Sequence, residues 1–471
     1  MSEAADFVFR LVKEHPEETA IRTLSRLQKV ALLLLLAGCL VWGALNFVLF
    51  LTVLNGVLMT FYIVLCCFKM YIIHLALGEQ KELSFTRGEV GSLRDEELPV
   101  YSILVPLYRE AESLERLIAG LKGLDYPQDR LDVLLLLEEN DGETLDAVQR
   151  IELPAFVRPI IVPHSLPKTK PKACNLGLAE ARGKYVVIYD AEDRPDPDQL
   201  KKAVLGFRRC PPDVICLQAR LNYYNQRQNL LTRLFTVEYS SWFDLYLPGL
   251  DNIGAPIPLG GTSNHFDLAR LRELLGWDPF NVTEDCDLGV RIAKHKLSTK
   301  MIESTTWEEA CSRLGYWVRQ RSRWTKGYIQ TYLVHCRRPL RLAHNLGFTN
   351  NVAFHLIVGG TPLCLLINPI YWAMTVVWFV FRSQAIGQLF PFPIILWGLL
   401  CLFLGNFVFI YASALATYRR GYYDLVKHSL IIPFYWILMS LGAWKGFLQL
   451  IYRPSYWEKT KHGFDLVGKT S

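Results

Sequence analysis

The amino-acid sequence predicts an α/β domain inserted between two groups of membrane-spanning helices. Of its 471 residues, 51% are hydrophobic and 20% are charged. The chain is therefore too apolar for a wholly soluble enzyme and too charged for a bundle of membrane helices alone. The apolar runs lie near the two ends, at about residues 30–75 and 350–451, and nearly all the acidic residues lie between them.

The first apolar run predicts a membrane hairpin. The segment "VALLLLLAGCLVWGALNFVLFLTVLNGVLMTFYIVLCCF" carries no charge over about 39 residues, whereas one span needs roughly 20. We therefore expect two helices over residues 30–75, joined by a tight turn near Asn46 or Asn55. Residues 1–29 would form a segment on the cytosolic side.

Basic residues flank this hairpin, and its turn carries no charge. The flanking cations are Lys29, Lys69, Lys81 and Arg87. Because the cytosolic flanks of membrane helices are enriched in Lys and Arg, the pattern places the N-terminus and the middle of the chain in the cytosol. We expect a multi-pass protein of the cytoplasmic (inner) membrane, with the lipid membrane as a partner.

The second apolar region, residues 350–451, predicts three or four membrane helices. Pro362 and Pro369 interrupt its first run, which is either one bent helix or two short ones, because proline removes a backbone donor. Three spans would leave the basic tail, residues 452–471, outside the cell, and four would return it to the cytosol. The basic residues slightly favour four.

The middle of the chain, residues 98–310, predicts a parallel sheet. Apolar runs of strand length alternate there with helical patterns, and we expect strands at 100–106, 131–139, 157–163, 184–190 and 213–219. Such alternation indicates a mostly parallel sheet covered by helices on both faces. In sheets of this kind, ligands bind beyond the carboxyl ends of the strands.

Carboxylates directly follow two of these strands. Glu138 and Glu139 end one strand, and Asp190, Glu192 and Asp193 follow another. Buried carboxylates need partners, so a bound cation or a hydrogen-bond network is expected. A turn built from Asp and Pro would also explain the second group. The sequence has no glycine-rich phosphate loop, which favours a divalent metal that bridges to phosphate.

A third acidic group opens the segment "NVTEDCDLGVRIAKH", residues 281–295, which has the pattern of an amphipathic helix. Thr283 could cap this helix, and Glu284, Asp285 and Asp287 would then favour the positive end of the helix dipole. Capping alone therefore explains the acidic residues about as well as a chemical role does.

Six segments together resemble a known family. They are "YSILVPLYRE", "LEENDG", "KPKACNLGLAEARGKYVVIYDAED", "LGGTSNHF", "NVTEDCDLGVRI" and "QRSRW", in this order over residues 100–324. Their order and spacing resemble the membrane-integrated family 2 glycosyltransferases, the cellulose synthase and hyaluronan synthase group. The resemblance implies a GT-A fold, which is Rossmann-like with a mostly parallel sheet, and a UDP-sugar as the donor.

The resemblance also implies a nucleotide site. Tyr108 matches the family position that stacks on uracil. Glu110, together with Glu138 or Glu139, matches the positions that hold the nucleoside. Lys172 matches a position near the diphosphate.

A metal site for Mg²⁺ or Mn²⁺ is implied next to it. Asp190 and Glu192 fall on the metal-binding D-x-D motif of the family. The sequence departs from that motif, because Glu stands in the second place and Asp193 follows immediately. Either Glu192 or Asp193 could therefore reach the metal.

The resemblance also implies a catalytic role for the acidic residues in the first turn of the helix predicted within residues 281–295. Asp285 matches the family's general base, which takes the proton of the acceptor hydroxyl and contributes roughly 10²–10⁴-fold to the rate. Glu284 would orient or cap beside it. Asp287 would face solvent or a structural partner.

Residues 311–345 mix cations with aromatic side chains. A nucleic-acid surface has that composition, but the adjacent spans favour amphipathic helices at the membrane interface, so no nucleic acid is expected as a partner. On the resemblance, Gln320, Arg323 and Trp324 form the Q-x-x-R-W motif. Arg323 would pair with diphosphate oxygens, and Trp324 would stack on the terminal sugar of the acceptor.

The segment "GGTSNHF", residues 260–266, resembles the loop that lines the acceptor site. Gly261 would allow close approach of the backbone, and Thr262, Ser263 and His265 would complete the loop. A structural role for His265, with both ring nitrogens bonded inside the protein, is the alternative.

The resemblance implies a processive, inverting enzyme that elongates a glycan from a UDP-sugar, with UDP-glucose as the expected donor, and moves the growing chain across the membrane. Trp372, Trp378 and Trp436 are candidates to line the path, unless they only face lipid or pack. A membrane enzyme that adds one sugar to a lipid acceptor is the alternative. An inactive membrane component is a third interpretation. Any regulation of the enzyme is expected to come from an accessory or regulatory subunit or from the N-terminal segment.

Overall fold

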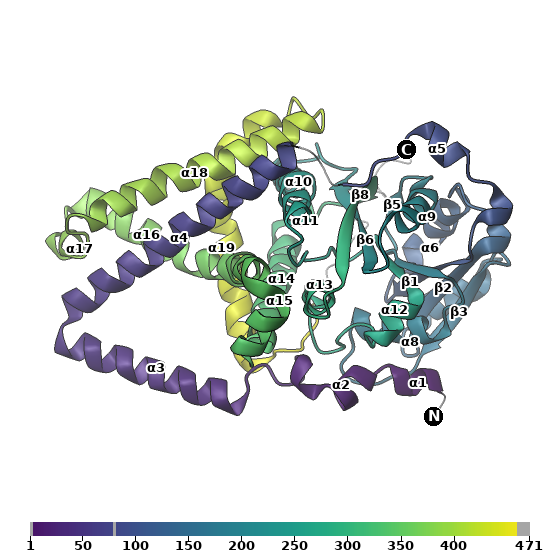
Figure 1. Cartoon of the computed structure of the whole chain (residues 1–471), viewed down its shortest axis with the longest axis horizontal. Helices are drawn as coiled ribbons and strands as arrows, with labels where there is room; N and C mark the ends of the chain where they lie inside the picture. The colour runs from purple at the N-terminus through teal and green to yellow at the C-terminus, as the bar shows by residue number, and fades with distance from the viewer. Residues whose placement is uncertain (1–2, 79–81, 459–471) are drawn as a thin grey trace.

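The computed structural model describes residues 3–78 and 82–458, and it confirms the predicted fold class. An α/β domain lies at one end of the molecule, and long apolar helices extend from it (Figure 1). Residues 1–2, 79–81 and 459–471, which include Lys81 and most of the basic tail, lie outside the described residues.

The domain is built on an eight-stranded sheet in the order β3-β2-β1-β4-β7-β6-β8-β5. The strands are β1 (Tyr101–Leu107), β2 (Leu131–Glu138), β3 (Val157–Val162), β4 (Tyr185–Ile188), β5 (Arg194–Pro195), β6 (Val214–Tyr223), β7 (Asn264–Asp267) and β8 (Ser298–Glu308). Strands β3, β2, β1 and β4 are parallel, and β7 runs antiparallel to both β4 and β6. Strands β5, β7 and β8 were not predicted.

Helices cover both faces of the sheet, because successive side chains of each strand point to opposite sides. Ile103 and Val133 belong to the core under one face, and Leu104 and Leu134 belong to the core under the other. The first face carries α6 (Leu114–Lys122), α7 (Gly142–Arg150) and α9 (Gln199–Arg209). The second core includes residues of α8 (Lys170–Glu180), α12 (Leu268–Glu273) and α13 (Glu284–Lys294).

Short helices precede and follow these elements. At the N-terminus, α1 (Glu3–Phe7) and α2 (Arg10–Glu14) lie along the α/β domain (Figure 1). The others that the argument needs are α10 (Leu230–Ser241), the π-helical turn Trp242–Tyr246, α11 (Leu247–Asn252), α14 (Leu314–His335), α15 (Pro339–Phe354) and α17 (Gln384–Gln388).

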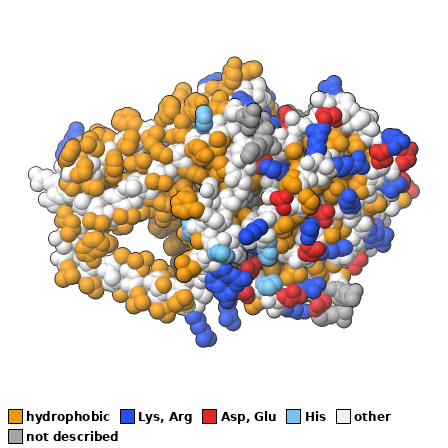
Figure 2. Space-filling model, in the orientation of Figure 1, with side chains coloured by type: hydrophobic (Ala, Val, Ile, Leu, Met, Phe, Trp, Pro, Cys, Tyr) orange, Lys and Arg blue, Asp and Glu red, His pale blue; other side chains and the backbone are white. Residues whose placement is uncertain are grey.

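Within residues 3–78 and 82–458, five helical segments are long and apolar enough to cross a membrane. They are α3 (Arg26–Leu45), α4 (Phe47–Leu77), α15 together with α16 (Gly360–Phe381), α18 (Ile394–Arg419), and α19 (Ile432–Tyr452) with the turn before it. Figure 2 shows hydrophobic side chains over the end of the molecule formed by these helices, and charged side chains over the α/β domain. This separation indicates membrane association.

The predicted hairpin turns at Asn46. Helix α3 ends at Leu45 and α4 begins at Phe47, and the Asn46 side chain accepts a hydrogen bond of 3.0 Å from the Leu49 amide. Asn55, the other predicted position for the turn, lies inside α4.

Helix α19 does not follow the direction of the other long helices. It lies along α14, where a methyl group added at Gly446 would be 2.4 Å from the carbonyl oxygen of Ser322. Figure 1 shows α19 running across the direction of α4 and α18. Residues 453–458 therefore lie beside the α/β domain, the side to which four C-terminal spans were predicted to return the tail, but the structure reaches it with a helix that runs across the others. Helix α16 continues through Pro369, so the fourth span is not formed.

The end of α4 is part of the domain core. Ile72, Ile73 and Ala76 are buried in the same hydrophobic cluster as the β-strands. A methyl group at Gly249 of α11 would be 2.2 Å from the carbonyl oxygen of Ile72, so only glycine allows this approach. The membrane helix and the α/β domain therefore pack as one unit.

Candidate active site

A cavity of about 1270 Å³ lies between the α/β domain and the long helices. The carboxyl ends of three parallel strands reach it, as the sheet topology predicts. The side chains that follow these strands and line the cavity are Tyr108 and Glu110 after β1, Glu138 at the end of β2, and Asp190 and Glu192 after β4.

The predicted nucleotide residues are only partly brought together. Tyr108 faces the cavity, and the Lys168 ammonium lies 3.8 Å from the centre of its ring. Lys172, by contrast, is buried behind the cavity wall and forms an ion pair of 3.1 Å with Glu138. Glu139 turns away and accepts a hydrogen bond of 2.8 Å from the backbone of His164.

Lys170, which was not predicted, occupies the position expected for Lys172. It lines the cavity and forms an ion pair with Asp190, and its ammonium donates a hydrogen bond of 2.7 Å to the carbonyl oxygen of Gly261. Two residues apart on a helix means a rotation of about 200°, so only one of the two lysines can face the cavity.

The acidic loop after β4 separates into two parts. Asp190 and Glu192 line the cavity, and burial together with the charge of Asp190 raises the pKa of Glu192 to about 7. Asp193 is buried below them, where it accepts hydrogen bonds from the Asp190 amide at 2.8 Å and from the Thr262 hydroxyl. The geometry therefore presents Glu192, and not Asp193, to the cavity.

The donor atoms suit a divalent cation that is shared with a substrate. Among residues 3–78 and 82–458, no group of three or more His, Cys, Asp or Glu side chains is arranged to hold a metal by itself. Asp190 and Glu192 offer two carboxylates, and Mg²⁺ commonly binds one or two carboxylates together with substrate phosphates and water.

The first turn of α13 carries the predicted base. The Thr283 side chain makes no capping bond, and its buried hydroxyl finds no partner among the described residues, so capping does not explain the acidic cluster. Asp285 lines the cavity and accepts a hydrogen bond of 2.7 Å from the Cys286 amide. Asp287 is buried and ion-paired with Arg291 at 2.9 Å, which makes it a structural residue.

Glu284 and Asp285 have different proton affinities. Burial, and then the charge of Asp285, raises the pKa of Glu284 to about 8. Burial also raises the pKa of Asp285, but hydrogen bonding to the Cys286 amide and the charge of Arg323 oppose this. Glu284 therefore holds its proton at neutral pH, and Asp285 is the one of the pair that can accept a proton.

The motif of α14 forms the wall opposite the acidic loop. Gln320, Arg323 and Trp324 all line the cavity. The ring of Trp324 packs against Phe235 and Tyr239, whose ring centres are both 6.1 Å away. The Trp324 side chain therefore has a fixed position where the cavity passes from the domain to the long helices.

Only part of the predicted acceptor loop, residues 260–266, lines the cavity. Gly261 and Thr262 line the cavity, whereas Ser263 is buried and bonded to Thr306 at 2.6 Å. His265 lies in the sheet, with its ring nitrogens 2.7 Å from the Tyr101 hydroxyl and 3.2 Å from Gln199. Burial lowers the pKa of His265 to about 3, so the ring is neutral.

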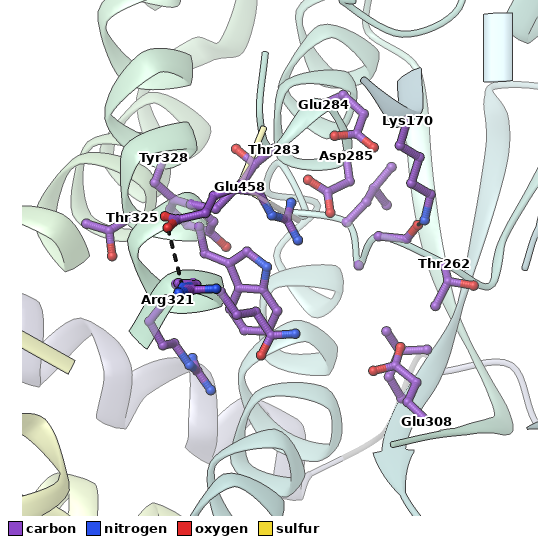
Figure 3. Close-up of a pocket in the computed structure, with 18 of the residues that line it drawn as sticks. Lys170, Thr262, Thr283, Glu284, Asp285, Glu308, Arg321, Thr325, Tyr328 and Glu458 are labelled. Carbon is purple, nitrogen blue, oxygen red and sulfur yellow. Dashed lines mark hydrogen bonds and ion pairs between the residues drawn. The ribbon is translucent and has the colours of Figure 1, made fainter. Parts of the chain in front are cut away.

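Other lining residues that were not predicted include Glu308, Thr325 and Tyr328. Figure 3 shows Lys170, Thr262 and Glu308 along one side of the cavity, and Thr325 and Tyr328 along the other. Glu308 ends β8, and an acidic residue at a strand end is the signal that pointed to Glu138. The signal was missed because β8 itself was not predicted.

The cavity continues between the long helices. Its far half is lined by Tyr62 and Lys69 of α4, Trp242 and Tyr246 of the π-helical turn, Thr361 and Leu365 of the α15–α16 segment, Phe409 of α18, and Trp436 and Met439 of α19. Trp436 was predicted to line such a path. Trp372 and Trp378 lie outside it, in contact with Phe434 and Phe379.

The chain is similar to known glycosyltransferases. The family model described as "Glycosyl transferase family 2" matches residues 102–263. Probable glycosyltransferase YdaM of Bacillus subtilis (strain 168) is 27% identical over 245 residues, 49% of this chain and 56% of its own. Glucomannan 4-beta-mannosyltransferase 2 of Arabidopsis thaliana is 29% identical over 210 residues, 42% of this chain and 39% of its own. The match thus spans about half, or less, of the length of these relatives.

Solved structures with a similar arrangement include mannosyltransferase PcManGT from Pyrobaculum calidifontis in complex with GDP-Man and Mn²⁺ (TM-score 0.45, 19% identity, 75% of this chain and 99% of that one). Another is S. aureus TarS 1-349 (TM-score 0.38, 14% identity, 70% of this chain and 90% of that one). The model described as "Glycosyl transferase family group 2" matches residues 185–437, more than half of the 471 residues. The chain therefore belongs to glycosyl transferase family group 2.

Proposed function

We propose that this protein transfers a sugar, with inversion, from a nucleotide diphosphate donor to the hydroxyl group of an acceptor that enters from the membrane side. One observation carries the proposal. A single cavity is lined by Asp190, Asp285 and Arg323 at one end and by side chains of the long helices at the other. Donor and acceptor can therefore meet at Asp285 from opposite directions.

Asp190 and Glu192 would hold Mg²⁺ or Mn²⁺ beside the diphosphate, and the metal would neutralise the charge of the leaving group. Lys170, beside Asp190, and Arg323, on the opposite wall, add positive charge to the same cavity. We propose UDP-glucose as the donor. GDP-mannose is the alternative to test, because the Arabidopsis relative is named a mannosyltransferase.

Asp285 would act as the general base. It takes the proton of the acceptor hydroxyl while the new bond to the anomeric carbon forms and the bond to the diphosphate breaks. One displacement from the face opposite the diphosphate inverts the configuration of that carbon. Glu284, which keeps its proton at neutral pH, adds no second negative charge beside the base.

We further propose that transfer is processive and that the product leaves through the membrane half of the cavity. Trp324 has a fixed ring at the passage between the two halves, and sugars stack on aromatic faces. Helices α3, α4, α16 and α18 would cross the cytoplasmic membrane, α14 and α19 would lie along its inner surface, and the α/β domain would face the cytosol.

The test is a transfer assay with the purified full-length protein in nanodiscs. Radiolabelled UDP-glucose, other UDP-sugars and GDP-mannose are each supplied with Mg²⁺ or Mn²⁺, and the products are separated by size. High-mass material that a specific glycanase digests supports processive synthesis. If no donor in the panel is consumed with either metal, the proposed function is wrong.

A second function is favoured by one observation, the buried cation of Lys69 in the membrane half of the cavity. A neutral glycan offers nothing that pairs with an ammonium group. A labelled glycolipid that carries a single sugar, as the only product of the same assay, would establish transfer to a lipid acceptor in place of polymer synthesis.

A further inference from the structure

We infer that Lys69, Tyr246 and Thr361 form a subsite for the phosphate ester of a membrane lipid, which serves as the acceptor or carries it. The inference rests on the proposed function, because it names the acceptor class of the same cavity. It starts from three polar groups that line the membrane half of the cavity.

Lys69 is a buried cation whose charge is not paired. Its side chain is 7% exposed. Its ammonium lies 4.5 Å from the ring centre of Phe409 and 5.2 Å from that of Tyr246, and no carboxylate of the described residues forms a salt bridge with it. Contacts with aromatic faces offset only part of the free energy needed to bury an ammonium ion. The cavity beside it therefore suits an anion.

The nearest carboxylate does not supply that anion. Glu238 is the acidic residue that acts on Lys69 electrostatically. However, both oxygens of Glu238 are bonded to the Arg321 guanidinium at 2.6 Å, and one of them also accepts from the Tyr435 hydroxyl at 2.9 Å. The charge of Glu238 is thus already matched by Arg321, and Lys69 remains in excess.

Two hydroxyl groups without partners line the same part of the cavity. The Tyr246 hydroxyl and the Thr361 hydroxyl are both buried and have no hydrogen-bond partner among the described residues. Thr361 lies one helical turn from Cys364, which is an electrostatic neighbour of Lys69, so the two share a helix face. One ammonium and two hydroxyls can donate to the oxygens of a single phosphate group.

The depth of Lys69 in the membrane indicates where the phosphate comes from. Helix α4 has 31 residues, a length of about 46 Å, whereas the hydrocarbon core of a bilayer is about 30 Å thick and takes roughly 20 residues. Counted from Phe47 at the hairpin turn, the core ends near residue 66. Lys69 therefore lies at the level of the lipid phosphates on the side of the α/β domain.

The remaining wall suits a lipid chain. Leu365, Phe409, Trp436 and Met439 line this half of the cavity, and they come from three different long helices. An acyl or prenyl chain can pack against these side chains while its phosphate ester meets Lys69. A free phosphate ion would gain nothing from them.

The test measures binding, so it does not depend on sugar transfer. The full-length protein in neutral detergent is heated with dodecyl phosphate, dodecanol or inorganic phosphate, because a ligand of the folded state raises the melting temperature. We expect dodecyl phosphate alone to raise the melting temperature of the wild type. Equal shifts with dodecanol, or with inorganic phosphate, would overturn the inference.

Single-residue variants test whether dodecyl phosphate binds at this subsite. Lys69→Met should weaken dodecyl phosphate binding about tenfold or more, as expected for the loss of a charge-assisted hydrogen bond, and Lys69→Arg should retain it. Lys29→Met removes a lysine that is exposed at the start of α3, and it should bind like the wild type. Unchanged binding by Lys69→Met would remove Lys69 from the site.

If Lys69→Met does not fold, Tyr246→Phe and Thr361→Val keep the size of each side chain and remove only a hydroxyl. Each should weaken binding of dodecyl phosphate and leave the response to dodecanol unchanged. Normal binding by both variants would overturn the inference. Binding without sugar transfer would contradict only the proposed function, and transfer without binding would contradict only this subsite.

Discussion

Arg323 donates a hydrogen bond of 3.0 Å to the carbonyl oxygen of Val282. This bond joins α14, which carries the Q-x-x-R-W motif, to the segment just before the first turn of α13. The two elements also touch at Gly327, where a methyl group would be 2.3 Å from the Thr283 hydroxyl. The proposed base and the cation proposed to face the leaving group are therefore held by one packed junction.

The adjacent carboxylates Asp285 and Glu284 make a matched pair of variants. Asp285→Asn should lower transfer by roughly 10²–10⁴-fold, because the amide keeps the size of the side chain but cannot accept a proton. Glu284→Gln should change the rate little at pH 7, because Glu284 is already protonated there. Initial rates of sugar transfer are compared between the two variants and the wild type. Nucleotide binding should be normal in both variants. Near-normal turnover by Asp285→Asn would exclude it as the base.

The pH dependence of the transfer rate should reflect the ionisation of Asp285 and Glu284. Asp285 must be ionised to accept a proton, and burial raises its pKa, so transfer should fall as the pH is lowered through that raised value. Loss of the Glu284 proton adds a negative charge to the cavity that would receive the anionic diphosphate, so donor binding and transfer should fall again above about pH 8. Initial rates from pH 5 to 9 test this. An alkaline decline that persists in Glu284→Gln would show that another group causes it.

The acidic loop predicts which carboxylates serve the metal. Asp190→Ala and Glu192→Gln should each raise the Mn²⁺ concentration needed for nucleotide binding, because both side chains face the cavity. Asp193→Asn should leave that concentration close to normal, since Asp193 bonds within the loop. Binding of UDP or GDP is measured across a Mn²⁺ titration. The assignment is reversed if Asp193→Asn, and not Glu192→Gln, alters the metal requirement.

The position of Trp324 predicts that polymer formation and donor hydrolysis can be separated by mutation. Trp324→Ala removes the sugar-stacking surface and leaves the carboxylates in place, so polymer formation should fall much more than hydrolysis of the donor. Stacking of a sugar on a ring is worth on the order of 1 kcal/mol per contact, or about fivefold in binding, and repeated additions multiply the loss. Product length and released nucleotide are measured in one assay. Equal loss of both activities would argue for a structural role.

The crosswise position of α19 predicts where the C-terminal residues lie. Two single-cysteine variants test this, Arg453→Cys and Gln384→Cys. Arg453 directly follows α19, and Gln384 lies in α17, between α16 and α18; both residues are exposed. In cells, an impermeant maleimide should label position 384 from outside and position 453 only after the membrane is opened, measured against the labelling of the parent chain. Labelling of position 453 from outside would make α19 a true span.

The parts of the fold and site that sequence predicted are those fixed by local pattern. The hairpin turn at Asn46 follows from a charge-free run of fixed length. The ends of β1, β2 and β4 bring Tyr108, Glu138 and Asp190 to one cavity because the carboxyl ends of parallel strands share an edge. Both features need only the order of strands and helices.

Features that depend on packing could not be predicted. Hydropathy finds long apolar helices, but the contact of Gly446 with α14 sets the direction of α19. Motif matching finds a lysine near position 172, but helix rotation brings Lys170 into the cavity. From the charge pattern, Lys69 was predicted to flank the membrane hairpin. In the structure α4 continues to Leu77, and Lys69 lies buried within this helix.

The close approach of Gly249 to Ile72 has a consequence for how this enzyme works at a surface. The end of α4 is packed into the α/β domain, so the height of the reacting groups above the bilayer would be set by this helix. In the proposed function, a water-soluble donor and a membrane-bound acceptor would therefore meet at a fixed level. Separating α4 from the domain would open the hydrophobic core that they share.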